Sequence, residues 1–288
     1  MVIAGIIVVF IAVAGWYLSR TSIPILQPRG VVAQKEYNLI MIGLLLSLIV
    51  VVPVFAFTIF VGLRYRDSNH KSKKYSPDWD HNRLFESLWW GVPAVIIIIL
   101  SVITWQSSHA LDPYKTLVSS KQTMTIEVIA LDWKWLFIYP GQHIASVNLA
   151  EFPVNQPVDF RITSDTVMNS FWVPQLGGQI YAMPGMTTHL NLMASKIGDY
   201  TGSSANISGR GFAGMAFDAK ATSSKTFNDW VVSIKKTSPV LNFGAYKALA
   251  LPNVVSQPLF YSSPTEGLFS ANVDKYMMPA TMNMNGAK

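Results

Sequence analysis

The chain has 288 residues, of which 50% are hydrophobic and 13% are charged, and its mean hydropathy is +0.31. This composition is too apolar for an ordinary soluble protein of that length and indicates membrane-spanning segments. The chain contains no cysteine, which excludes disulfide bonds and thiolate metal sites. The net charge of +6 is concentrated in one short loop, where it sets membrane topology and does not indicate a nucleic-acid partner.

Three apolar segments occupy the first 105 residues. The first, Val2 to Leu18, is about 17 residues long, at the lower limit for a membrane helix. Two interpretations stay open for residues 1–20: an uncleaved signal anchor, or a signal peptide removed during export. The other two, at about 39–63 and 85–105, are predicted to form a transmembrane hairpin within residues 21–110.

Basic residues dominate the loop at 64–84, which joins the two long spans. Six arginine and lysine side chains in it outnumber three aspartates. The positive-inside rule therefore places this loop in the cytoplasm, and everything that follows the hairpin on the exported side.

The hydrophobic pattern changes from helical to alternating after Asp112 and Pro113. Short alternating runs separated by Pro, Gly and Asn turns predict an all-β sandwich over residues 111–222. The predicted strands are Thr123–Ala130, Trp133–Tyr139, Pro157–Thr163, Ser170–Val173, Thr188–Met193 and Gly214–Ala219. Residues 223–288 are predicted to form an aromatic-rich helical extension. Its predicted helices are Thr226–Lys236, Val240–Leu249 and Pro264–Met278.

Glu86 lies at the cytoplasmic end of the third apolar span. A carboxylate at the start of a helix is favoured by the helix dipole, so a helix-end charge is one interpretation. Charged groups beside membrane helices are also candidates for proton uptake. The residues alone leave both interpretations open.

A copper-loop pattern without its ligands lies between Asn169 and Met215. This pattern and several others, in one colinear order, resemble subunit II of haem-copper respiratory oxidases. The matching segments are Tyr75–Trp79, Glu86–Pro93, His109–Pro113, Leu131–Trp135, Asn169–Pro174, Tyr181–Gly185 and Gly202–Gly209.

The resemblance also identifies what has been lost. Copper-bearing members hold a dinuclear centre with two His, two Cys, one backbone carbonyl and one Met. The corresponding positions here are Asn169, Ser204, Asn206, Ser208, Phe212 and Met215. Copper needs thiolate and imidazole donors, and among the side-chain donors at these positions only that of Met215 is kept. The resemblance therefore implies no metal or cofactor in this chain, as is typical of quinol oxidases of the cytochrome bo type.

The family resemblance implies a fold, an activity and partners. The fold is a membrane helical hairpin followed by a cupredoxin-like Greek-key sandwich. The activity is that of subunit II of a proton-translocating ubiquinol oxidase that reduces O₂ to water, with haems, copper and the quinol site in subunit I. The implied partners are subunits I, III and IV and the bilayer of a bacterial inner membrane, with the C-terminal domain in the periplasm. The Glu86–Pro93 match implies that Glu86 lies near the entrance of a proton pathway of subunit I.

Two other function classes are weighed against this one. A copper-loaded subunit that accepts electrons from cytochrome c would need thiolates and an acidic docking face, whereas residues 106–288 carry about 13 basic and 11 acidic side chains. A free-standing tethered module would need only one anchor, whereas two apolar helices suggest packing against a larger membrane partner. We therefore expect no cytochrome c docking.

Overall fold

The computed structural model describes residues 13, 15–16, 20, 23–65 and 81–277. Most of residues 1–20, the loop segment Tyr75–Trp79 and the end of the chain lie outside the described residues, so the interpretations of the first segment stay predictions. The chain divides into two compact units. One is Asn38–Asp112, and the other combines the chain before residue 38 with the chain from Pro113 onward.

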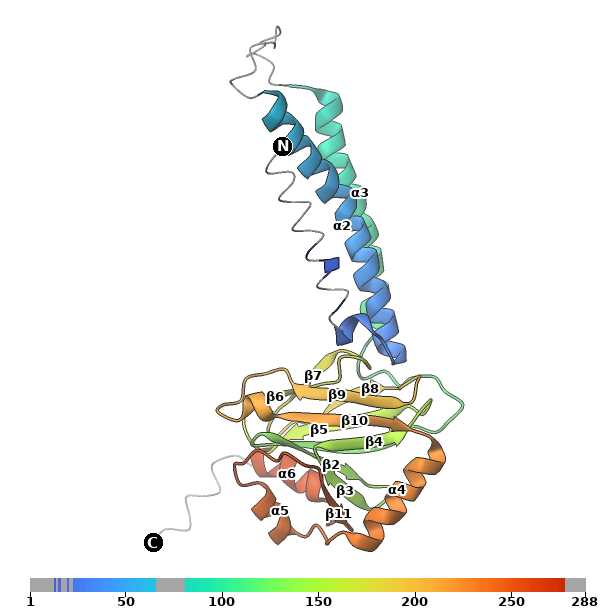
Figure 1. The fold of residues 1–288 in the computed structure, drawn as a ribbon, viewed down its shortest axis with the longest axis vertical. Coiled ribbons are helices and arrows are strands. Elements are labelled where there is room, and N and C mark those ends of the chain that lie inside the picture. Colours follow the sequence, from blue (N-terminus) through green and yellow to red (C-terminus); the bar gives the residue numbers. More distant parts are fainter. Residues whose placement is uncertain (1–12, 14, 17–19, 21–22, 66–80, 278–288) are drawn as a thin grey trace. The chain divides into compact units, whose positions relative to one another are not determined.

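Two long apolar helices make up the unit at Asn38–Asp112 (Figure 1). Helix α2 spans Val31–Arg64, so its first turns belong to the other unit, and helix α3 spans Arg83–Ala110. Both are long and apolar enough to cross a membrane. Helix α2 extends beyond the predicted apolar span mainly at its start, and α3 mainly at its end, because the more polar residues at 31–38 and 106–110 are also helical.

Two β-sheets pack face to face in the second unit, which confirms the predicted sandwich. The larger sheet has the strand order β11-β3-β2-β1-β5-β8 and the smaller has the order β4-β10-β9-β6-β7. Parallel pairing joins β1 to β5 and β10 to β4. The strands are β1 Met124–Leu131, β2 Lys134–Tyr139, β3 Ile144–Val147, β4 Leu149–Pro153, β5 Val158–Ser164, β6 Asn169–Trp172, β7 Gln179–Ala182, β8 Thr188–Leu192, β9 Gly198–Ser204, β10 Ala216–Thr222 and β11 Leu259–Ser262.

Five of these strands have no counterpart among the predicted ones: β3, β4, β7, β9 and β11. The strands β3 and β4 are short and are separated by Asn148, whose φ of 57° interrupts the pattern. The strand β9 is polar and glycine-rich, a composition that is depleted in strands, and β7 has only four residues, too few to show an alternating pattern. Pairing with neighbouring strands, and not local preference, makes these segments extended.

The central strands β1 and β2 of the larger sheet are covered on both faces. One set of β1 and β2 side chains, including Val128 and Trp135, faces the smaller sheet in the main core. The alternate set, including Ile129 and Leu136, lies in a second core beneath the C-terminal extension. Each buried leucine or isoleucine contributes about 1.5–3 kcal/mol, so this cover is a substantial part of the fold.

The C-terminal extension contains three helices and one strand among the described residues (Figure 1). The helices are α4 Ser224–Thr237, α5 Phe243–Leu249 and α6 Leu268–Met277. Helix α5 begins later than predicted because Asn242 caps it, its Oδ1 accepting from the Ala245 N–H at 2.9 Å. Helix α6 also begins later than predicted, after a turn in which Gly267 has a φ of 72°.

The segment before and into α2 is attached to the sandwich. The Arg29 and Gly30 N–H groups donate to the Gln175 carbonyl at 2.8 and 3.1 Å, and the Glu36 carboxylate accepts from the Gly178 N–H at 3.0 Å. A Cβ at Gly30 would lie 2.6 Å from the Leu176 carbonyl oxygen, so only glycine fits there. Residues 29–37 are therefore a structural part of this unit.

Candidate functional site

The residues that the sequence marks as a former copper site meet at one end of the smaller sheet. Asn169 begins β6 and Ser204 ends β9, and both are buried. The Ala205 N–H donates to the Ser170 carbonyl at 3.0 Å, which ties the two strand ends together. The loop then passes through a 3₁₀ turn, η2 at Phe212–Gly214, and reaches Met215 directly before β10.

Three of the marked residues form one hydrogen-bonded cluster. The Ser204 hydroxyl lies 3.1 Å from both the Asn169 side-chain oxygen and the Asn206 carbonyl. The Asn169 side-chain N–H₂ donates to the Val167 carbonyl at 3.0 Å, and that of Asn206 donates to the Met168 carbonyl at 2.9 Å. The polar atoms at these positions therefore bond to one another and to the backbone, as buried polar groups require.

Two further marked residues, Ser208 and Met215, contact each other within the same loop. The Ser208 hydroxyl lies 3.7 Å from the Met215 sulfur, and Met215 is buried. Trp133 lies against this part of the loop, and its indole N–H donates to the Ser208 carbonyl at 3.2 Å. A Cβ at Gly211 would approach the Trp133 ring to 2.3 Å, so the ring packs directly on backbone.

These residues do not fit a copper centre. Asn169, Ser204 and Ser208 present amide and hydroxyl groups already used in the hydrogen bonds above. Phe212 is partly buried in η2 and its ring carries no donor atom. Soft thiolate and imidazole ligands are required for such a site, and the single thioether of Met215 does not replace them. Hydrogen bonds, and not metal–ligand bonds, hold this loop together.

Two charged residues that the sequence analysis did not single out hold the extension on the sandwich. Lys134 is fully buried, and its ammonium donates to the Leu251 carbonyl at 2.8 Å and contacts the Asn253 side chain. Burial lowers the pKa of the Lys134 ammonium, with Asp132 opposing that shift. Asp165, between β5 and β6, accepts hydrogen bonds from α5 and α6. A lone charged residue has no periodic signal, so sequence reasoning could not find this role.

Glu86 lies in the first turn of α3. The Asn82 side chain caps the helix by accepting from the Leu84 and Phe85 N–H groups at 3.0 and 3.2 Å. Glu86 Oε1 in turn accepts from the Asn82 N–H at 3.3 Å and lies 3.2 Å from His81 Nδ1. The carboxylate is thus part of a reciprocal helix cap and is still 38% exposed.

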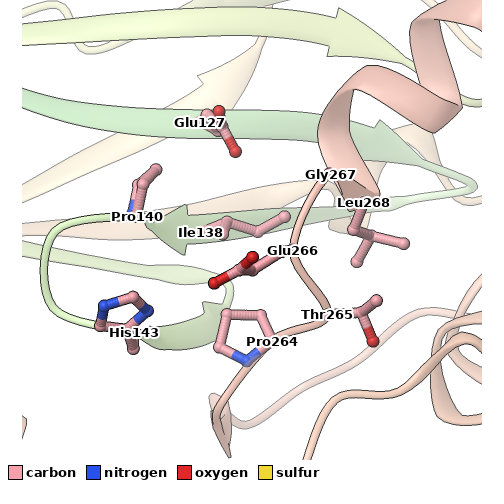
Figure 2. A pocket seen from close by; sticks show the side chains of 9 residues that line it. All are labelled: Glu127, Ile138, Pro140, His143, Pro264, Thr265, Glu266, Gly267 and Leu268. Atoms are coloured by element: carbon pink, nitrogen blue, oxygen red, sulfur yellow. The ribbon is translucent and has the colours of Figure 1, made fainter.

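A cavity of about 240 Å³ lies between the outer face of the larger sheet and the start of α6 (Figure 2). Glu127 of β1, His143 of the β2–β3 turn and Glu266 surround it in Figure 2. Burial raises the pKa of the Glu127 carboxyl, and Arg161 partly offsets that rise. Within the described part of the chain, no three His, Cys, Asp or Glu side chains form a group able to hold a metal ion. The cavity has no assigned role.

The sandwich and the C-terminal extension each match a known protein family. Residues 142–222 match the family described as cytochrome C oxidase subunit II, periplasmic domain, and residues 235–280 match the COX Aromatic Rich Motif. Cytochrome bo(3) ubiquinol oxidase subunit 2 of Pseudomonas putida is 48% identical over 259 residues, which are 90% of this chain and 82% of that protein. Ubiquinol oxidase subunit 2 of Acetobacter aceti is 46% identical over 274 residues, 94% of this chain and 88% of that protein.

The chain belongs to the ubiquinol oxidase subunit 2 family. Membership confirms the predicted resemblance, and it makes this chain one subunit of an oxidase complex. It is a ubiquinol oxidase subunit 2 with two candidate membrane helices among the described residues, and is therefore a membrane-anchored subunit. The solved periplasmic domain of subunit II of cytochrome oxidase (CoxB) of Bradyrhizobium japonicum covers 42% of this chain and 98% of its own, at 25% identity and a TM-score of 0.39.

Proposed function

We propose that this chain is the redox-inactive subunit II of a respiratory oxidase that oxidises ubiquinol, reduces O₂ to water and moves protons across the membrane. The observation that carries the proposal is the hydrogen-bonded cluster of Asn169, Ser204 and Asn206, which stands where copper-bearing members have ligands. A quinol oxidase needs no copper relay from cytochrome c. The chain then serves assembly and covers the outer face of its partner.

The cofactors of the reaction belong, in this proposal, to a partner. Haems, copper and the ubiquinol site lie in subunit I, and subunits III and IV complete the complex. The membrane is a bacterial inner membrane, α2 and α3 cross it, and the sandwich lies in the periplasm. The nearly balanced charge of residues 106–288 and the missing thiolates support the expectation that neither cytochrome c nor nucleic acid docks here.

Glu86 is proposed as the entrance carboxylate of a proton pathway in subunit I. Its side chain is 38% exposed on this chain, and the Asn82 N–H holds it at the start of α3. The cap explains why a carboxylate suits this position locally, and it holds the same group where protons would enter. The two roles are therefore compatible, and a variant must separate them.

The proposed function is tested on the complex that co-purifies with this chain after mild detergent extraction. O₂ consumption is measured with ubiquinol and, in parallel, with reduced cytochrome c as the electron donor. We expect haem-containing subunits to co-elute and ubiquinol alone to sustain O₂ consumption. Sustained consumption with cytochrome c, or elution of the chain without a haem-containing partner, would contradict the proposal.

A further inference from the structure

The buried carboxylate of Asp165 is hydrogen-bonded to two helices of the C-terminal extension, α5 and α6. The Asp165 side chain is 5% exposed. It accepts hydrogen bonds from the Tyr246 hydroxyl of α5 at 2.6 Å, and from the Lys275 ammonium and Tyr276 hydroxyl of α6 at 2.6 and 2.9 Å. The Tyr276 hydroxyl is also 2.9 Å from the Asp165 backbone carbonyl. Asn272 supports the group by donating to the Tyr246 hydroxyl at 2.7 Å.

The same carboxylate belongs to the short connection that leads into the former copper site. Asp165 follows β5, and Asn169 begins β6 only four positions later. The backbone carbonyls of Val167 and Met168, between them, accept the hydrogen bonds of the Asn169 and Asn206 side chains. The extension and the Asn169–Ser204 cluster therefore hold the two ends of one loop.

The contact also reaches the turn that follows β7. A Cβ at Gly185 would lie 3.2 Å from the Tyr276 Cβ, so α6 packs closely on this turn. The Thr163 hydroxyl donates to the Met183 carbonyl of the same turn at 3.2 Å. The end of α6 thus contacts the β5–β6 connection and the β7–β8 turn together.

We propose that Asp165 is the positioning residue through which the C-terminal extension fixes the β5–β6 connection and, with it, the Asn169–Ser204 cluster. In a copper-bearing loop, metal–ligand bonds hold these strand ends, because ligands from separate segments converge on the metal. Here, hydrogen bonds from the extension do so. The comparison with a copper-bearing loop rests on the proposed function, because it assumes that this loop holds no metal. The contacts of Asp165 are independent of that assumption.

The test is hydrogen exchange, followed by mass spectrometry, on the intact complex carrying Asp165→Asn. The amide keeps the size of the side chain but lacks the charge and one acceptor oxygen. We expect peptides covering 165–171 and 204–208 to exchange about tenfold faster or more, which corresponds to about 1.4 kcal/mol of local opening free energy. Peptides from the buried strands β1 and β2 keep their wild-type rates.

Two further variants make the test decisive. Tyr276→Phe removes the hydroxyl that donates to the Asp165 side chain and backbone carbonyl, and it keeps the ring, so it should reproduce the effect even if Asp165→Asn does not assemble. Lys225→Ala removes the solvent-exposed ion pair with Asp229 in α4 and should leave both loops unchanged. Faster exchange confined to α6, with residues 165–171 and 204–208 at wild-type rates, overturns the proposal.

The outcome is separable from that of the proposed function. A complex that consumes no O₂ with ubiquinol, yet exchanges faster at 165–171 in Asp165→Asn, would remove the proposed function and keep Asp165 as the positioning residue. An active complex whose loop exchange is unchanged in Asp165→Asn would keep the proposed function and remove the positioning role of Asp165.

Discussion

Glu86 combines a local structural role with a proposed proton-transfer role, and Glu86→Gln separates the two. The amide oxygen can still accept from the Asn82 N–H, so the helix cap persists, but the side chain no longer titrates. We expect ubiquinol oxidase turnover to fall by about tenfold or more at unchanged haem content. Glu86→Asp should be milder, because the carboxylate remains and only its reach shortens.

Asn82→Ala is the matched control for this variant. It removes the side-chain cap of α3, at a cost of about 1 kcal/mol, and leaves the Glu86 carboxylate in place. Turnover should stay near wild type. If Asn82→Ala slows turnover as much as Glu86→Gln, or if Glu86→Gln has no effect, Glu86 is a helix-end charge only.

The hydrogen bonds of the Asp165 carboxylate should make the stability of the protein depend on pH. Burial by itself would raise the pKa of the Asp165 carboxyl, but hydrogen bonds from one ammonium and two phenols outweigh it and hold the pKa below its ordinary value. A carboxyl whose pKa is depressed by folding contributes fully above its unfolded pKa, about 3.9 for Asp. That contribution is lost as the pH falls through the folded-state pKa.

The expected result is a destabilisation by Asp165→Asn that depends on pH. At pH 7 the variant should lose roughly 1.5–3 kcal/mol, the net contribution of a hydrogen bond to a charged group. The difference from wild type should shrink as the pH falls below about 4. Lys275, Tyr246 and Tyr276 stay protonated throughout that range, so they do not mask the effect. Thermal unfolding of both chains between pH 7 and pH 3 measures it, and a difference independent of pH would be inconsistent with this assignment.

At the scale of elements, the attachment of residues 29–37 to the sandwich depends on Gly30. Gly30→Ala places a methyl group 2.6 Å from the Leu176 carbonyl oxygen, and backbone cannot yield cheaply. We expect a loss of about 1–3 kcal/mol in thermal unfolding of the full chain, with faster proteolysis before α2. Gly141→Ala is the control, because a Cβ there meets nothing within 4 Å. Equal stability of the two variants would show that this attachment does not matter.

The sequence predicts elements where one physical signal dominates. Long apolar runs predict α2 and α3, alternation predicts β1, β5 and β8, and a short apolar run predicts β2. It does not predict β9 and β11, since a glycine-rich strand and a four-residue edge strand become extended only through their neighbours. The continuous burial of Lys134–Tyr139 likewise follows from a second layer, formed by a segment about a hundred residues further along the chain.

At the scale of the whole molecule, the family resemblance predicts which residues belong to the candidate site. It does not predict the hydrogen bonds that these residues make. The resemblance places Asn169, Ser204 and Ser208 where copper-bearing members have ligands. The structure adds that Asn169 and Ser204 bond to each other, and that the extension reaches the same loop through Asp165. Those partners lie 35 and 81 positions apart, distances over which a single sequence has no periodic signal.

Copper titration of the purified full chain, followed by elemental analysis and visible spectroscopy, tests the central claim most directly. A rebuilt variant serves as the positive control, with the changes Asn169→His, Ser204→Cys, Asn206→Glu, Ser208→Cys and Phe212→His. The variant loses the side-chain hydrogen bonds of Asn169 and Ser204 but keeps the backbone bond from the Ala205 N–H to the Ser170 carbonyl, so restored metal donors should give a purple dinuclear centre. The wild-type chain should retain no copper and stay colourless. About one or two tightly held copper ions per wild-type chain would contradict the account.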